Sequence, residues 1–232
     1  MEKTIKQPAI LRFYHSPIGK KLTTGITGLG LSLFVLAHMV GNLLMFVGHD
    51  AYNTYAYLLE RVWPLLWTVE LVLLAVFLLH AATGLYIFRT RLQARPVAYA
   101  TYASRGEPSL QSLSSRTMII TGGALGTFLV IHLMHFKYGT YYTTELGGQE
   151  VRDLARLVVE NFRRPVYTWS YSGVVVLLGF HLRHGVWSAL QSLGTMAKSF
   201  KPLLYGVSLV FAIAIATGFL ILPLAIYFNL VN

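Results

Sequence analysis

Four histidines lie inside strongly apolar stretches of this 232-residue chain, where an imidazole is chemically conspicuous. The stretches are "VLAHMVGN" around His38, "FLLHAATG" around His80, "VIHLMHF" around His132 and "GFHLRHG" around His181. Burying a neutral imidazole costs free energy unless a hydrogen bond or a metal takes its lone pair. One such residue is as readily a polar packing residue or part of a proton relay. Four of them on four separate stretches favour metal ligation.

Two of these histidines lie at similar depth, measured from the nearest cationic residue along a helix that rises 1.5 Å per residue. His38 comes 17 residues after Lys21, which corresponds to about 26 Å. His132 comes 16 residues after Arg116, which corresponds to about 24 Å. We call His38 and His132 the deep pair.

The other two histidines lie closer to the same side. His80 precedes Arg89 by 9 residues, about 14 Å, and His181 precedes Ser192 by 11 residues, about 16 Å. We call His80 and His181 the shallow pair. Each has a glycine four residues later, Gly84 or Gly185, on the same helix face. A glycine there leaves room for a flat macrocycle beside the ring.

Two imidazoles at one depth can fill both axial positions of a haem iron, and such a haem transfers electrons without binding O₂. Depth alone does not exclude His135 and His184, each three residues after one of the four. The chain has no Cys, which excludes iron–sulfur clusters, disulfides and covalent haem attachment through a CxxCH motif. The pattern therefore predicts two non-covalent haems of the b type.

Five long apolar segments must position these histidines, in a chain that is 55% hydrophobic and 12% charged. About 20 apolar residues in helical form cross a bilayer, and segments this long must be helices. We therefore expect an all-α fold, a single integral membrane domain over residues 1–232 with five transmembrane helices. The expected spans are residues 22–48, 62–88, 117–136, 165–192 and 202–231.

The distribution of Lys and Arg predicts the orientation of the spans. The N-terminal arm, the second-to-third loop and the fourth-to-fifth region hold 13 of them, and the opposite side holds 6. The positive-inside rule then places the N-terminus in the cytoplasm and the C-terminus outside. This rule explains the net charge of +10 better than nucleic-acid binding does.

Two shorter helices are expected on the extracytoplasmic side. In "EVRDLARLVVENF", apolar residues recur at helical spacing, which predicts an amphipathic helix lying on that surface; they are Val151, Leu154, Leu157, Val158 and Phe162. In "HDAYNTYAYLLERVW" we expect a smaller helix, with Asp50 near its start as the cap.

Several motifs together resemble the di-haem cytochrome b subunit of succinate:quinone oxidoreductases, the five-helix anchor of succinate dehydrogenases and fumarate reductases. They are "SPIGKKLTTGITGLGLSLFVLAHMVGNL", "YNTYAYLLE", "LLHAATGLYI", "SSRTMIITGGALGTFLVIHLMHF" and "GFHLRHGVWSALQSLG". The resemblance runs from about Ser16 into the fifth helix. It implies two b haems, one ligated by histidines of the first and third helices and the other by histidines of the second and fourth helices. The family's axial ligands match His38 and His132 for the distal haem and His80 and His181 for the proximal one, in preference to His135 and His184.

The resemblance also implies partners and a location. Such subunits hold a flavoprotein and an iron–sulfur protein on the cytoplasmic face of the bacterial cytoplasmic membrane. Electrons pass between the iron–sulfur subunit and membrane quinone, most often menaquinone, and the dicarboxylate-oxidising site is not on this subunit. Some fumarate reductases carry a proton-conducting glutamate just before the fourth ligand. Here Gly179 and Phe180 occupy that neighbourhood, so this proton route is not expected.

Glu70 is the only acid within an expected span, 10 residues before His80 and therefore about 15 Å nearer the outer side. An intramembrane acid is a functional candidate, so we consider Glu70 a proton donor or acceptor for quinone near the distal haem. The plainer interpretation is a carboxyl group satisfied by a neighbouring helix. The alternative quinone site is cytoplasmic, near Ser16 and Lys20.

Cationic residues at the cytoplasmic rim are candidates to neutralise the propionates of the proximal haem. They are Lys20, Arg89 and Arg116, and their plainer role is to set the topology. Competing functions are another di-haem b-type electron-transfer protein, such as a transmembrane reductase or the membrane subunit of a formate dehydrogenase. A haem-free transporter or scaffold would leave the matched histidines unexplained.

Overall fold

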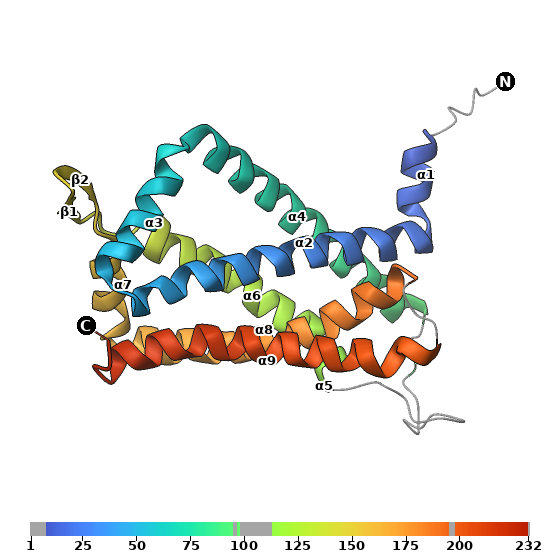
Figure 1. Cartoon of the computed structure of the whole chain (residues 1–232). Coiled ribbons are helices and arrows are strands. Elements are labelled where there is room, and N and C mark those ends of the chain that lie inside the picture. Colours follow the sequence, from blue (N-terminus) through green and yellow to red (C-terminus); the bar gives the residue numbers. More distant parts are fainter. Residues whose placement is uncertain (1–7, 95–96, 98–112, 195–197, 232) are drawn as a thin grey trace.

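The computed structural model describes residues 8–94, 97, 113–194 and 198–231. Five long helices form a bundle (Figure 1). Each is long and apolar enough to cross a membrane, which confirms the expected all-α multi-pass membrane bundle. The helices are α2 (Pro17–Leu43), α4 (Trp63–Ala94), α6 (Met118–His132, continued by the π-helical turn η2, Leu133–Lys137), α8 (Pro165–Ser192) and α9 (Lys201–Tyr227).

The first helix begins five residues earlier than expected because capping, and not apolarity, sets its start. The side chain of Ser16 accepts a hydrogen bond from the backbone N–H of Gly19 at 3.0 Å, and Pro17 occupies the first turn. This is a favoured N-terminal arrangement, and it carries the two charged residues Lys20 and Lys21 into the helix. At the other end a 3₁₀ turn, η1 (Leu44–Phe46), follows α2.

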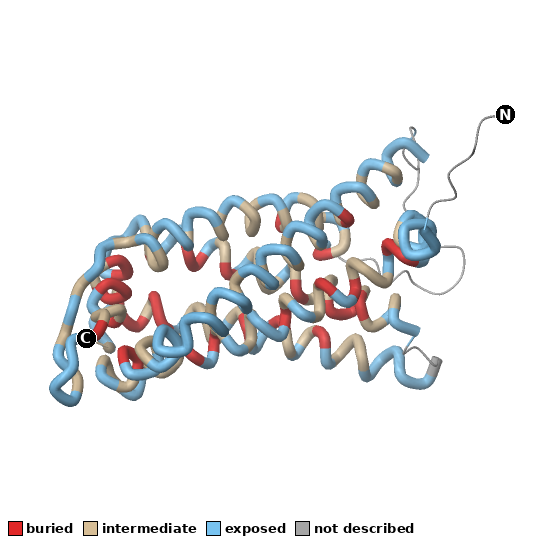
Figure 2. The backbone as a smooth tube through the Cα atoms, turned by 90° about the horizontal axis from the view of Figure 1, so that it is seen from above, coloured by how far each residue is buried: buried red, intermediate tan, exposed pale blue. Residues whose placement is uncertain are grey.

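The long helices pack in a definite order. α8 lies along α9 and also contacts α2 and α6, while α2 contacts α4. In Figure 1, the C-terminal part of α4 lies against α2. The N-terminal part of α4, which follows α3, lies farther from α2. Most outward-facing positions of the bundle are exposed and apolar, as expected of surfaces that meet lipid (Figure 2).

Two smaller helices and a hairpin lie at one end of the bundle, which we call the α7 end. They are α3 (His49–Arg61), the antiparallel pair β1 (Thr143–Leu146) and β2 (Gln149–Arg152), and α7 (Leu154–Phe162). The opposite end, the α1 end, carries α1 (Ala9–His15), α5 (Leu113–Arg116) and η3 (Lys198–Phe200). Four of the 13 basic residues assigned to this side lie outside the described residues: Lys3, Lys6, Arg95 and Arg105.

Both expected short helices form, but α7 starts later than expected and α3 lacks the expected cap. Val151 belongs to strand β2, opposite Thr144, and α7 begins only after Asp153, whose carboxylate accepts from the N–H of Arg156 at 3.0 Å. In α3, Asp50 lies in the first turn, but Gly48 holds the N-cap position and no side chain caps the helix. Gly48 has φ 141°, a conformation that favours glycine.

The α7 end contains a tightly packed apolar cluster. Buried members include Met45, Ala155, Val158, Tyr171 and Ile226, from four different segments. The apolar face of α7 is therefore covered by the protein itself, and the expectation that this helix lies on the membrane surface gives way to packing on the bundle. In Figure 2, buried residues, coloured red, gather near the end marked C.

Candidate functional site

The deep pair comes together between α2 and α6. The ring centroids of His38 and His132 are 5.7 Å apart, with the planes at 85°. Four phenylalanine rings lie within 6 Å of them, so the immediate neighbours of the pair are largely apolar. These rings are Phe34 and Phe219 beside His38, and Phe128 and Phe136 beside His132.

The shallow pair comes together between α4 and α8. The ring centroids of His80 and His181 are 6.4 Å apart, with the planes at 70°. A metal held by two imidazole nitrogens at about 2 Å each places the ring centroids about 6 Å apart. Both pairs have this spacing, and each joins the two helices that the depth count had matched.

The structure separates His132 from its neighbour His135. Nδ1 of His135 lies 3.0 Å from the hydroxyl oxygen of Tyr171, and its ring centroid is 4.6 Å from that of Tyr167. His135 is thus turned toward the tyrosines of α8, while His132 faces His38. On the other helix pair, His181 is the ring that faces His80.

Each ring of the shallow pair is held by a threonine from a neighbouring helix. Thr27 of α2 places its hydroxyl oxygen 3.1 Å from Nδ1 of His80. Thr121 of α6 places its hydroxyl oxygen 3.1 Å from Nδ1 of His181. Sequence reasoning missed both threonines. The available signal was the repeated "ITG", at residues 26–28 and 120–122, eleven residues before each member of the deep pair.

Glycines let helices and rings approach closely at the shallow level. A Cβ added to Gly28 would lie 3.1 Å from Cε1 of the His80 ring, and one added to Gly122 would lie 3.4 Å from Cε1 of His181. Gly84 and Gly185, one turn after each shallow histidine, have more space around them than Gly28 and Gly122. No described atom lies within 4 Å of a Cβ added to Gly84 or Gly185. The described protein leaves space beside these ligand positions.

The donor atoms and surroundings of the two histidine pairs can be compared with what a haem requires. Among the residues that the structure describes, no group of three or more His, Cys, Asp or Glu is placed to hold a metal ion. Nδ1 of His132 is buried without a hydrogen-bond partner in the described part of the chain. A buried nitrogen of this kind costs free energy unless a further group pairs with it. Facing imidazoles, apolar walls and open glycine positions together suit a planar, doubly ligated cofactor.

Glu70 lies near the α7 end, where its carboxylate forms an ion pair with Lys137 of η2. The Lys137 ammonium is also 5.5 Å from the ring centroid of Trp67, and both charged side chains are 32% exposed. The carboxyl group is therefore satisfied from a neighbouring helix, as in the plainer interpretation of the sequence. Lys137, the cation of this pair, lies five residues after His132.

The three cations considered for propionates lie at the α1 end, in different environments. Lys20 is only 8% exposed; its ammonium donates to the carbonyl of His15 at 3.0 Å and lies 3.7 Å from the ring centroid of Tyr86. It precedes Thr27 by two turns, about 10 Å along α2. Arg89 and Arg116 are exposed.

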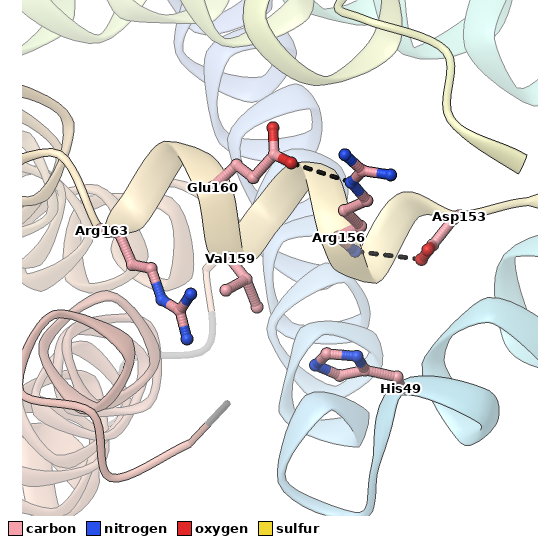
Figure 3. Close-up of a pocket in the computed structure, with 6 residues that line it drawn as sticks. All are labelled: His49, Asp153, Arg156, Val159, Glu160 and Arg163. Atoms are coloured by element: carbon pink, nitrogen blue, oxygen red, sulfur yellow. Dashed lines mark hydrogen bonds and ion pairs between the residues drawn. The ribbon is translucent and has the colours of Figure 1, made fainter. Parts of the chain in front are cut away.

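A surface pocket at the α7 end is separate from the histidine pairs (Figure 3). Its volume is about 380 Å³ and its lining residues are His49, Asp153, Arg156, Val159, Glu160 and Arg163. Hydrogen bonds from the Tyr142 hydroxyl at 2.6 Å and from Nε of Arg156 at 2.8 Å lower the pKa of the Glu160 carboxyl. With these charges already paired, the pocket presents no convergent chemistry.

The assignment of the site rests on these residues and distances. Comparison of the chain with protein-family models, with curated proteins and with solved structures found no match.

Proposed function

We propose that this chain is the membrane anchor and electron-transfer subunit of a succinate:quinone oxidoreductase. The observation that carries the proposal is the presence of two facing histidine pairs at two levels of one bundle, one between α2 and α6 and one between α4 and α8. The resemblance in sequence supplies the class of complex. The partners are an iron–sulfur subunit, a flavoprotein subunit and a membrane quinone.

The deep pair holds one b haem and the shallow pair holds the other. When bound, each iron exchanges one electron between its ferric and ferrous states. The chain's own residues would hold each group between two imidazoles, surround it with phenylalanines at the deep level, and leave space for it beside Gly84 and Gly185 at the shallow level. Lys20, with Arg89 and Arg116 at the same end, supplies positive charge for the propionates of the shallow haem.

Two levels are needed if electrons are to cross most of the bilayer. Thr27 contacts His80 and so marks the shallow level on α2; His38 follows eleven residues later, about 16 Å along the helix. The same interval separates Thr121, which contacts His181, from His132. By the positive-inside rule the α1 end is cytoplasmic and the α7 end is extracytoplasmic. Electrons then travel between an iron–sulfur protein at the α1 end and the deep level.

Quinone reacts beside the deep haem, where Glu70 and Lys137 offer a proton donor or acceptor and a cation. A quinone needs one or two polar groups at its carbonyls, and the ion pair between Glu70 of α4 and Lys137 of η2 supplies them. Menaquinone is the quinone that the resemblance implies. The competing position lies at the α1 end near Ser16 and Lys20.

The test is a reduced-minus-oxidised visible spectrum and a haem count on the purified chain, together with its co-purifying proteins. We expect two low-spin b haems. His80→Ala or His181→Ala should remove one of them, and His38→Ala or His132→Ala the other. Absence of haem from the wild-type chain refutes the proposal. Two haems without a co-purifying iron–sulfur protein and flavoprotein identify instead another di-haem b-type electron-transfer protein.

A further inference from the structure

The two threonines beside the shallow pair have a hydrogen-bonding pattern that fixes the direction of their contacts. The Thr27 hydroxyl lies 2.7 Å from the carbonyl oxygen of Thr23, one turn back on α2. The Thr121 hydroxyl lies 3.1 Å from the carbonyl oxygen of Thr117, one turn back on α6. In both contacts the hydroxyl is the donor and the carbonyl oxygen, which can only accept, takes its one proton.

The hydroxyl oxygen that remains can accept a hydrogen bond from the imidazole. The 3.1 Å contacts to Nδ1 of His80 and His181 are then N–H···O bonds in which the ring donates. A neutral imidazole that carries its proton on Nδ1 has its lone pair on Nε2. Both shallow rings are thereby prepared to bind a metal through Nε2.

The arrangement is repeated, which distinguishes it from an incidental contact. Thr27 is 7% exposed and Thr121 is 2% exposed, so neither hydroxyl has ready access to water. Each threonine is followed by a glycine, Gly28 or Gly122, against which Cε1 of the held ring packs. The same contact between a threonine hydroxyl and Nδ1 is therefore made from α2 to one ring of the shallow pair and from α6 to the other.

We propose that Thr27 and Thr121 are positioning residues of the shallow haem site, which hold His80 and His181 with the proton on Nδ1 and present Nε2 to iron. The inference rests on the proposed function and deepens it. It assigns a double role to α2 and α6, because each carries a ligand of the deep pair and orients a ligand of the shallow pair.

Loss of the hydroxyl acceptor has a defined electronic consequence. A ligand imidazole whose N–H donates to an acceptor is more basic and stabilises the ferric state more strongly. Without the acceptor, the reduction potential of the shallow haem rises. A relative loss of ferric binding on the order of tenfold corresponds to an upward shift of about 59 mV for a one-electron couple.

The experiment compares Thr27→Val and Thr121→Val, which remove the hydroxyl at nearly constant shape, with Thr27→Ser and Thr121→Ser, which keep it. Matched controls are Thr90→Val on α4 and Thr127→Val on α6, whose hydroxyls bond only backbone carbonyls in the described structure. The readouts are haem per chain, the electron paramagnetic resonance signal of each ferric haem, and each midpoint potential by redox titration.

We expect the valine variants to raise the midpoint of the shallow haem or to lose that haem, and the serine variants to restore the wild-type values. The deep haem and both control variants should remain unchanged. Valine variants with a wild-type shallow signal and midpoint overturn the inference, while two haems in the wild type still uphold the proposed function. If a valine variant does not accumulate, Thr→Ala is compared with Thr→Ser, and equal midpoints overturn the inference.

Discussion

The open space beside the shallow histidines leads to a prediction whose sign depends on the cofactor. Gly84 and Gly185 lie inside α4 and α8, one turn after the ring on the same face, and a Cβ at either position meets no described atom within 4 Å. Replacing glycine by alanine in a helix interior gains about 0.5–1 kcal/mol. The double alanine variant should therefore stabilise the haem-free chain by about 1–2 kcal/mol, since neither added Cβ meets a described atom within 4 Å through which the two changes could couple.

A larger side chain should have the opposite effect on the loaded protein. Leucine at Gly84 or Gly185 fills the space that the macrocycle edge needs, so the shallow haem should be lost while the deep haem is retained. The chain is produced with and without haem supply, and haem content and thermal unfolding in detergent are measured. For a chain of this size, 1 kcal/mol corresponds to about 2–4 °C in Tm.

The control is Gly206→Leu on α9, a helix that supplies no histidine to either pair and whose glycine likewise has no described atom within 4 Å of an added Cβ. This variant should load both haems. If Gly84→Leu and Gly185→Leu also load two haems with unchanged spectra, the reasoning that these glycines admit the macrocycle is refuted.

Three further predictions concern other parts of the bundle. His132→Ala should lose the deep haem and His135→Ala should keep both, because only His132 faces the opposite ring; visible spectra and haem counts check this. Glu70→Gln should keep both haems but lower quinone-linked turnover, because it removes the ionisable carboxyl near the deep level. Asn53→Ala should lower the free energy of unfolding by about 1–3 kcal/mol, because the buried N–H of Ala155 loses its acceptor at 2.9 Å.

Each of these has a clear contrary result. Loss of a haem in His135→Ala with both retained in His132→Ala would exchange the two roles. Full turnover in Glu70→Gln, with quinone bound only beside Ser16, would move the quinone site to the α1 end. For Asn53→Ala, unfolding in denaturant at the wild-type midpoint would show that the link between α3 and α7 adds nothing to stability.

Much of the fold was predictable because lipid leaves few choices for the backbone. Long apolar segments had to be helices, and all five formed. The errors lie where local chemistry overrides apolarity. The hairpin was missed because Val151 matched the helical spacing of the residues after it, although Gly147 and Gly148 just before it signal a tight turn. These glycines have φ of 58° and 78°, the conformation that two-residue hairpin turns require.

The histidine pairs were predictable from depth, since position along a helix can be counted from the sequence. The contacts of Thr27 and Thr121 were not, because they depend on how far one helix is rotated toward another. The ion pair of Glu70 with Lys137 could not be predicted either, because the charge of Lys137 placed it outside the expected third span, which ended at residue 136. The π-helical turn at Leu133–Lys137 carries that lysine alongside α4 instead.

The tight packing of the α7 end has a consequence for how the protein is assembled. Met45, Ile226 and Asn53 are among its most deeply buried side chains, and the Asn53 amide also donates to the Asp153 carboxylate at 2.9 Å. Local opening occurs at the lowest cost where few apolar contacts hold the backbone. Amide hydrogens should therefore exchange slowest around α3 and α7 and faster toward the α1 end, where the contacts of α4 include those of Thr83 with Tyr14, His80 with Thr27 and Tyr86 with Lys20. If a cofactor is inserted after the helices have packed, the α7 end of the bundle can therefore remain folded, and only the helices at the α1 end need to separate to admit it.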